Sequence, residues 1–208
     1  MSVPGPSARA PSARARSVIA IDGLDGSGKS YFAVALAAAA EAAGQPAVVL
    51  HVDDYRLPVV FEGQSAEGEA ALYYERYYDF PALGDALAAF LAGGADGALA
   101  VVEGVFVLRA GLPAEAPLVV LEVSPAEARR RILARDRAKG RTPEEIARRI
   151  ERRYFPAQAR YRAAFDPVAR ADILVDNDDW IRPRVVRRAD GRFPPQVVPG
   201  LDRLLSAG

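Results

Sequence analysis

Residues 17–30 have the sequence SVIAIDGLDGSGKS, and this stretch decides the fold. It begins with Ser17 to Ile21, an apolar run rich in β-branched residues, which is typical of a strand buried on both faces. A glycine-rich turn follows, and an alanine-rich helix is expected from Lys29 to Ala43, ended by Gly44 and Pro46. A strand, a tight turn and a helix in this order predict the first unit of a parallel α/β sheet.

The turn matches the pattern G-x-x-x-x-G-K-[ST] and lies, as that pattern requires, between a strand and a helix. Its glycines let backbone N–H groups surround phosphate oxygens, and the helix adds its positive N-terminal end. Lys29 is expected to act on the β- and γ-phosphates of ATP, and the Ser30 hydroxyl is expected to bind Mg²⁺. We therefore predict that ATP and Mg²⁺ bind to a phosphate loop made of Gly23, Leu24, Asp25, Gly26, Ser27, Gly28, Lys29 and Ser30.

Further apolar runs predict strands over residues 47–50, 99–102, 118–121 and 171–175. Helices are expected over residues 81–91 and 201–205, and after the start signals at Ser124 and Thr142, each followed by proline and glutamate. Residues 58–69 are polar and lack periodicity, so we expect a loop there. The pattern predicts a P-loop NTPase fold, a three-layer sandwich with a five-stranded, mainly parallel sheet between two layers of helices.

The composition excludes several kinds of site. The 208 residues include 27 Lys+Arg and 27 Asp+Glu, so no net charge favours nucleic acid or a membrane, and we expect neither as a partner. There is no cysteine for thiol chemistry, and one histidine cannot build a multi-imidazole site. Residues 1–16 are rich in Ser, Ala, Pro and Arg and are expected to form a disordered tail before one domain over residues 17–208. We expect a cytoplasmic protein and leave its oligomeric state open.

Acidic residues follow two of the predicted strands. Asp53 and Asp54 come after residues 47–50, and Glu103 comes after residues 99–102. Because ligands of open parallel sheets gather at the carboxyl ends of the strands, these acids are candidates for chemistry. Asp53 suits a general base, with Asp54 as the alternative, and Glu103 suits a Mg²⁺ ligand that acts directly or through water. The competing interpretation is that these acids cap helices or turns.

Four blocks of the sequence together resemble the uridine kinase group of P-loop kinases, which also includes phosphoribulokinase, pantothenate kinase and nicotinamide riboside kinase. The blocks are Gly23 to Ser30 in the form G-x-x-G-S-G-K-S, Asp53 to Arg56, Val102 to Gly104, and Arg135 to Arg141. The resemblance implies transfer of the γ-phosphoryl of ATP to a hydroxyl group, with Lys29 and Asp53 as catalytic residues. It also implies an arginine-rich lid, in which Arg135 and Arg141 are catalytic and Lys139 replaces one of the family's arginines.

A weaker match concerns the phosphoryl acceptor. Tyr78 to Pro81 is similar to the F-D-H-P segment whose Asp holds ribose hydroxyls, which implies that Asp79 binds a nucleoside-like acceptor. Tyr55 and Arg76 lie nearby in the sequence and are further candidates for acceptor binding. Residues 83–102 leave no room for the family's base-reading hairpin, so loose base discrimination is expected. Nicotinamide riboside, pantothenate and sugar phosphates remain alternative acceptors, and an ATPase or nucleotide switch remains an alternative function.

Two clusters have simpler interpretations besides the functional ones. The cations of residues 129–141 could form a solvated helix face paired with glutamates, or contact nucleic acid, which the neutral chain disfavours. The tyrosines of residues 73–78 could stack on a flat acceptor or pack in the core. Trp180 could flank adenine or pack on the surface.

Overall fold

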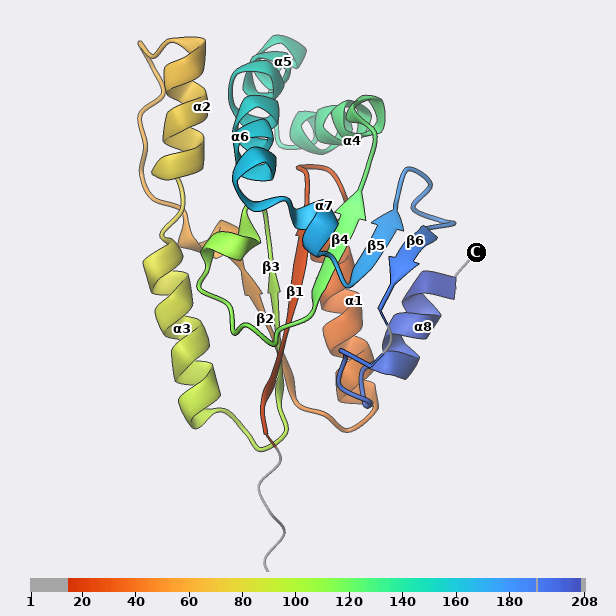
Figure 1. Cartoon of the computed structure of the whole chain (residues 1–208). Coiled ribbons are helices and arrows are strands. Elements are labelled where there is room, and N and C mark those ends of the chain that lie inside the picture. Colours follow the sequence, from red (N-terminus) through yellow and green to blue (C-terminus); the bar gives the residue numbers. More distant parts are fainter. Residues whose placement is uncertain (1–14, 190, 207–208) are drawn as a thin grey trace, which may run out of the picture.

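A six-stranded sheet lies at the centre of the protein, with the strand order β2-β3-β1-β4-β5-β6 (Figure 1). The computed structural model describes residues 15–189 and 191–206. The strands are β1 (Ser17–Gly23), β2 (Ala47–His51), β3 (Leu99–Glu103), β4 (Leu118–Glu122), β5 (Ile173–Asp176) and β6 (Arg184–Arg188). The first five run parallel, and β6 runs antiparallel to β5. The predicted α/β fold and its five strands are confirmed.

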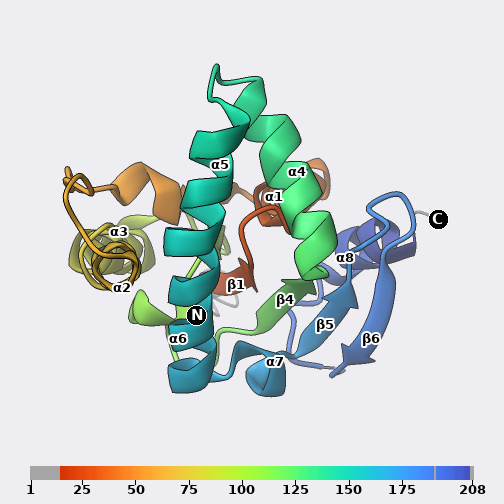
Figure 2. The same ribbon diagram turned by 90° about the horizontal axis from the view of Figure 1, so that it is seen from above.

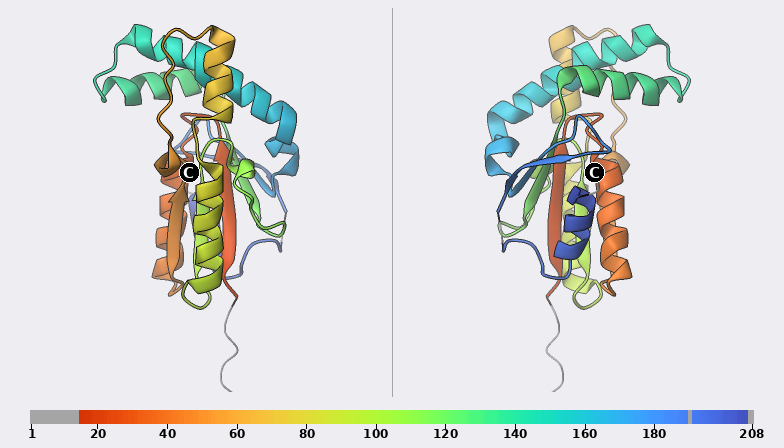
Figure 3. Two further views of the ribbon diagram at one scale, coloured as in Figure 1. Left: turned by 90° about the vertical axis from the view of Figure 1, so that its left-hand side faces the viewer. Right: turned by 90° about the vertical axis from the view of Figure 1, so that its right-hand side faces the viewer.

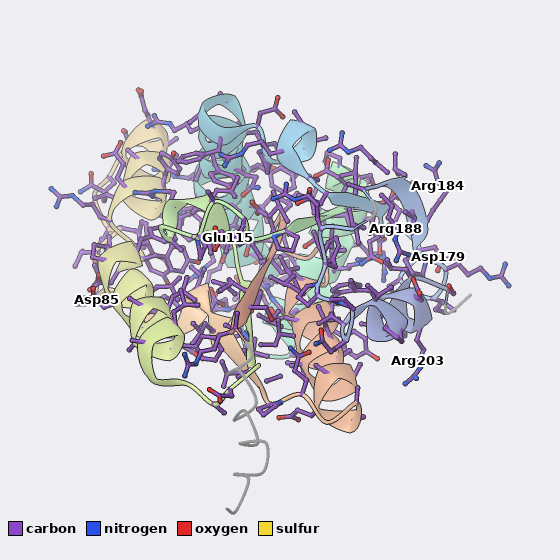
Figure 4. All side chains as sticks on the ribbon, turned by 60° about the horizontal axis from the view of Figure 1, so that its bottom comes forward. Asp85, Glu115, Asp179, Arg184, Arg188 and Arg203 are labelled. Carbon is purple, nitrogen blue, oxygen red and sulfur yellow. The ribbon has the colours of Figure 1, made fainter. Side chains whose placement is uncertain are left out.

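The structure adds a sixth strand that was not predicted, because β6 gives almost no sequence signal. Its residues read RVVRR and are exposed along their whole length, so apolar and polar positions do not alternate. The strand pairs with β5 through backbone hydrogen bonds, with a bulge between Leu174 and Val175. Arginines along an outer strand also discourage pairing with further strands. Figure 4 shows Arg184 and Arg188 of this strand on the side of the molecule opposite to Asp85.

The two faces of the sheet bury two separate cores. Val18 and Ala20 of β1 face a core shared with α3 (Phe80–Gly93) and α6 (Phe155–Phe165). Ile19 and Ile21 point the other way, against α1 (Lys29–Ala42) and α8 (Val198–Ser206), which lie side by side (Figures 1 and 3). The apolar side chains of β1 thus point alternately to the two cores, as expected for a parallel sheet covered on both faces. The predicted three layers are confirmed.

A helical hairpin lies above the carboxyl ends of the strands (Figure 2). It consists of α4 (Pro125–Arg137) and α5 (Pro143–Arg149), and α5 continues through the π-helical turn η3 (Ile150–Tyr154) into α6. The predicted starts are confirmed: the Ser124 side chain caps α4, and Thr142 forms a capping box with Glu145. Ile146, Ile150 and Tyr154 are buried along one side of the continuous rod.

The predicted loop over residues 58–69 was wrong at its end, because α2 (Ala66–Glu75) begins there. Ser65 caps this helix by accepting a hydrogen bond from Gly68 N at 3.0 Å. The fully buried Glu69 accepts ion pairs at 2.7–2.8 Å from three arginines of α5 and η3, which are Arg148, Arg152 and Arg153. Tertiary ion pairs fix this helix, and local periodicity cannot reveal them.

Short turns and the chain ends complete the fold. The turns are η1 (Val52–Tyr55), η2 (Val107–Arg109) and α7 (Pro167–Arg170). Of the predicted disordered tail over residues 1–16, residues 1–14 lie outside the described residues. Arg16 donates hydrogen bonds to Gly94 O at 2.6 Å and to Leu91 O at 2.9 Å. Within the described ranges, every helix is too short or too polar to cross a lipid bilayer.

Asp22, at the end of β1, is a fully buried carboxyl group. Its Oδ1 accepts a hydrogen bond from Gly23 N at 2.7 Å, and its Oδ2 accepts one from the Tyr161 hydroxyl. Burial raises the pKa of Asp22 to about 6, and these hydrogen bonds and the nearby charges of Lys29 and Arg162 offset that effect only in part. Folding therefore favours the protonated form of this group.

This raised pKa makes the free energy of unfolding depend on pH. The contribution of Asp22 is complete below about pH 4 and is lost as the pH rises through about 6. In Asp22→Asn the side chain cannot ionise, although it still accepts a hydrogen bond. The free energy of unfolding should therefore fall less between about pH 4 and pH 7 in this variant than in the wild type, by up to roughly 3 kcal/mol. Urea unfolding at both pH values measures this difference. Equal losses in the two proteins would contradict the prediction.

Candidate active site

The phosphate loop has the backbone that its glycines predict. A Cβ atom on Gly23 would lie 2.4 Å from Ser27 Oγ and 2.7 Å from Leu121 O, so no side chain fits there. Gly26 and Gly28 have φ values of 82° and 91°, in the region that favours glycine. Lys29 and Ser30 then open α1 and, together with Gly26 and Gly28, line a hollow of about 270 Å³, named here the polar hollow for its Lys and Arg side chains. Four of the eight predicted loop residues therefore line one hollow at a helix N-terminus, which is an arrangement suited to phosphate.

Side chains that sequence reasoning missed hold this loop from behind. The buried Asn177 donates from Nδ2 to Ser27 O at 2.7 Å. Arg131 of α4 donates to Asn177 O at 2.6 Å and to Gly26 O at 3.3 Å. The only sequence signal for Asn177 is its position directly after a predicted strand, where functional polar residues often lie. Through these contacts Asn177, which follows β5, and Arg131 of α4 hold the shape of the loop.

A second cleft, named here the upper cleft, lies between the phosphate loop, η1, α2 and the α4–α5 hairpin. Aromatic and charged residues line it, among them Asp25, Asp53, Tyr73, Tyr77, Tyr78 and Arg135. It encloses about 70 Å³. Pockets for small molecules take roughly 300 Å³ or more, so a ligand can bind only after the walls of the cleft move apart.

Two tyrosine hydroxyls lie between Asp25 of the phosphate loop and Asp53 across this cleft. The Tyr73 hydroxyl donates to Asp25 Oδ2 at 3.4 Å, the Tyr73 and Tyr78 hydroxyls lie 3.0 Å apart, and the Tyr78 hydroxyl donates to Asp53 Oδ1 at 3.2 Å. Burial raises the pKa of Asp25, and the charges of Lys29 and Arg135 offset the effect only in part. Two tyrosines therefore orient both carboxyl groups toward a common space. The neighbouring Asp54 does not line the cleft.

The predicted lid residues lie at the same cleft. Arg135 and Arg141 both line it, and both bind the buried Asp136, at 2.7 Å and 3.2 Å. Arg135 also lines the polar hollow around Lys29 and Ser30. One guanidinium group thus belongs to the walls of both spaces, so it lies between the expected donor phosphates and Asp53.

Glu103 ends β3 as a buried carboxylate. Its Oε1 lies 2.5 Å from His51 Nδ1, and its Oε2 is buried without a hydrogen-bond partner. A Cβ atom on the next residue, Gly104, would lie 2.3 Å from Val52 Cβ, which explains the glycine in this Glu-Gly pair. The unpartnered carboxylate oxygen of Glu103 and the Ser30 hydroxyl of the phosphate loop are oxygen donors of the kind that Mg²⁺ prefers.

No cluster of three or more Asp, Glu, His or Cys side chains within residues 15–189 and 191–206 could hold a metal ion. Mg²⁺ usually binds to one or two protein oxygens and to substrate phosphates and does not need such a cluster. Ser30 and Glu103 are therefore suitable ligands in the presence of a nucleotide.

An apolar hollow of about 280 Å³, named here the side hollow, opens beside the phosphate loop. Its walls include Tyr31, Phe32, Arg130, Trp180 and Pro183. It shares Gly28, Tyr31 and Arg131 with the polar hollow around Lys29. A planar base could therefore lie against these rings while its phosphates reach the loop.

The three predicted acceptor residues do not line the upper cleft. Asp79 caps α3, because its Oδ1 accepts a hydrogen bond from Ala82 N at 3.0 Å. Tyr55 packs against the core at the end of η1, and Arg76 follows α2 as an exposed side chain. Tyr73, Tyr77 and Tyr78 reach the cleft instead, although Tyr73 and Tyr78 are also buried in the core.

The mostly parallel sheet between two layers of helices matches the P-loop kinase fold, and two solved structures are similar to it. A possible uridine kinase from Bacillus stearothermophilus aligns with a TM-score of 0.57 and 22% identity, over 79% of this chain and 91% of its own. A proposed fructose transport system kinase from Silicibacter sp. TM1040 gives 0.56 and 21%, over 74% and 87%. No protein-family model and no curated protein matches the sequence. At these sequence identities, the chain is similar to the two structures in fold alone.

Trp180 is the single tryptophan of the chain and is 62% exposed at the side hollow. We predict that Mg·ATP changes its fluorescence, because a bound base would exclude water from the ring. In Asn177→Ala the Ser27 carbonyl loses its hydrogen bond, so the apparent Kd for ATP from this signal should rise roughly tenfold. Asp179→Ala, an exposed change in the same loop, serves as the control. Equal Kd values in all three proteins would contradict the role given to Asn177.

Proposed function

We propose that the protein is an ATP-dependent kinase that transfers the γ-phosphoryl group to a hydroxyl of a small acceptor. One observation carries this proposal: Arg135 lines both the polar hollow of Lys29 and Ser30 and the upper cleft that contains Asp53. A donor phosphate, a stabilising cation and a base would thus meet at one place. The fold shared with two kinase structures supports the same activity. We further propose that residues 17–208 form a single kinase domain in a cytoplasmic protein.

Different residues act as the base, stabilise the charge and bind Mg²⁺ during phosphoryl transfer. Asp53 takes the proton of the acceptor hydroxyl as its oxygen bonds to the γ-phosphorus, while the bond to the β–γ bridging oxygen breaks and ADP leaves. Lys29 and Arg135 balance the charge on the moving phosphoryl, and Arg141 supports Arg135 through their shared partner Asp136. Mg²⁺, held by Ser30 and by Glu103 directly or through water, would neutralise charge on the β- and γ-phosphates.

We also propose which class of compound accepts the phosphoryl group. The aromatic lining of the upper cleft supports a flat, nucleoside-like acceptor, as the resemblance to uridine kinases implies. The capping role of Asp79 weakens the specific expectation that this residue holds ribose hydroxyls. A screen of ATP consumption over nucleosides, nicotinamide riboside, pantothenate and sugar phosphates would identify the acceptor class. Turnover of ATP without any acceptor, at an undiminished rate, would indicate an ATPase instead.

Asp53→Asn should leave ATP binding intact and remove most of kcat, because an amide of the same shape cannot take the proton. Asp54→Asn is the matched control, since Asp54 is exposed at the adjacent position and does not line the upper cleft. Steady-state rates and ATP titrations on both variants test the assignment. The opposite pattern, with Asp54→Asn inactive and Asp53→Asn active, would show that the neighbouring carboxylate is the base.

Lys29→Ala should reduce phosphoryl transfer at least roughly a hundredfold, because the lost cation acts mainly on charge that develops in the transition state. The rate of ADP formation with the best acceptor of the screen measures this effect. Near-normal turnover in this variant would show that the phosphate loop is not the catalytic site.

A further inference from the structure

The upper cleft contains an excess of positive charge. Its carboxylates are Asp25, Asp53 and Asp136. Its cations are Arg56, Arg135, Lys139, Arg141, Arg149 and Arg153. A site that received only a neutral hydroxyl compound would need a base and a few hydrogen bonds, and most of these cations would have no role in it.

The donor phosphates account for only part of this charge. The polar hollow of the phosphate loop is lined by Lys29, Arg131 and Arg135, besides the backbone of its glycines. Of the cations in the upper cleft, only Arg135 belongs to both spaces. The remaining cations therefore line the side where the acceptor would bind. They come from three different places in the chain, after η1, in the turn between α4 and α5, and in α5 and η3.

Three of these remaining cations already have carboxylate partners. Arg56 pairs with Asp53 at 3.2 Å, Arg141 pairs with Asp136 at 3.2 Å, and Arg153 pairs with the buried Glu69 at 2.7 Å. The guanidinium of Arg153 also lies 3.8 Å from the centre of the Phe61 ring. Rigid placement of this kind prepares a charge for a ligand and lowers the entropy lost on binding.

Arg149 and Lys139 differ from the others, because neither pairs with a carboxylate within the described part of the chain. Arg149 is the last residue of α5 and is partly buried, and its side chain hydrogen-bonds to Tyr154. A partly buried guanidinium without a counter-charge is unfavourable unless an anion binds to it. Its planar donors suit two oxygens of a phosphate or a carboxylate.

We propose that the acceptor carries an anionic group, a phosphate or a carboxylate, besides the hydroxyl that is phosphorylated, and that Arg149 binds this group with Lys139 beside it. The proposal rests on the kinase activity proposed above. It narrows the acceptor from small hydroxyl compounds in general to anionic ones, including nucleotides, sugar phosphates and hydroxy acids. Asp53 would then act at one part of the cleft while the anion is held at another.

Binding of inorganic phosphate tests the anion site without knowledge of the acceptor. The full-length protein is first saturated with Mg²⁺ and a non-hydrolysable ATP analogue, followed through Trp180, so that the donor site is filled. Calorimetric titration should then show phosphate binding in the millimolar range, weakened roughly tenfold or more in Arg149→Gln. Arg137→Gln removes the same charge from an exposed position in α4 outside the cleft, and should bind phosphate as the wild type does.

The outcomes of this titration are distinct. No phosphate binding to the nucleotide-saturated wild type, or equal affinity in Arg149→Gln, would overturn the proposal. If the ATP analogue itself does not bind, the proposed kinase function fails first, and the failure is visible before phosphate is added. Folding of each variant is checked by its unfolding temperature, which should match that of the wild type.

Matched acceptors provide the second test. Each pair differs by one anionic group that takes the place of one hydroxyl and leaves others free: uridine and uridine 3′-monophosphate, ribose and ribose 5-phosphate, pantothenol and pantothenate. The charged member should have the higher kcat/KM, by roughly tenfold or more, and Arg149→Gln should raise its KM while the KM for ATP is unchanged. Faster, Lys29-dependent phosphorylation of the neutral members would overturn the anionic acceptor and leave the kinase assignment intact.

Discussion

Close packing around Gly23 is the constraint on which the rest of the site depends. Ser27 Oγ and Leu121 O approach so near that only a residue without Cβ lets the chain turn there. This turn closes the phosphate loop and delivers Lys29 to the start of α1. Because β1, β2 and β3 run parallel, the loop opens at the same end of the sheet at which the chain leaves β2 and β3. The carboxylates that follow those strands therefore share one end of the molecule with the phosphate loop.

Ion pairs join two walls of the upper cleft, α2 and the segment of α5 and η3. The third wall, the turn between α4 and α5, has fewer contacts. Glu69 joins α2 to α5 and η3 through three arginines, so these elements form one block. The turn between α4 and α5 has fewer ties, because residues 138–141 connect to the rest mainly through Asp136. Since a cleft of about 70 Å³ must widen to take a ligand, we expect the lid turn to move rather than α2. Such a motion would carry Lys139 and Arg141 toward or away from the acceptor side of the upper cleft.

Sequence reasoning recovered the parts of this protein that local signals encode. The apolar strands, the glycine-rich loop and the helix caps at Ser124 and Thr142 were predicted, because propensity and capping act over a few residues. It missed β6, α2 and the role of Asn177, because these depend on partners that are distant in the sequence. It placed Asp53, Arg135 and Arg141 among the site residues, and the structure brings these three to one cleft.

The central claim is that the donor phosphates and the base meet at Arg135. A crystal structure with Mg²⁺ and a non-hydrolysable ATP analogue tests it most directly. The account predicts that the γ-phosphate contacts Lys29 and Arg135 and faces the carboxylate of Asp53 across the upper cleft, with Mg²⁺ on Ser30. A nucleotide whose γ-phosphate points away from Asp53, or one bound outside the phosphate loop, would contradict it.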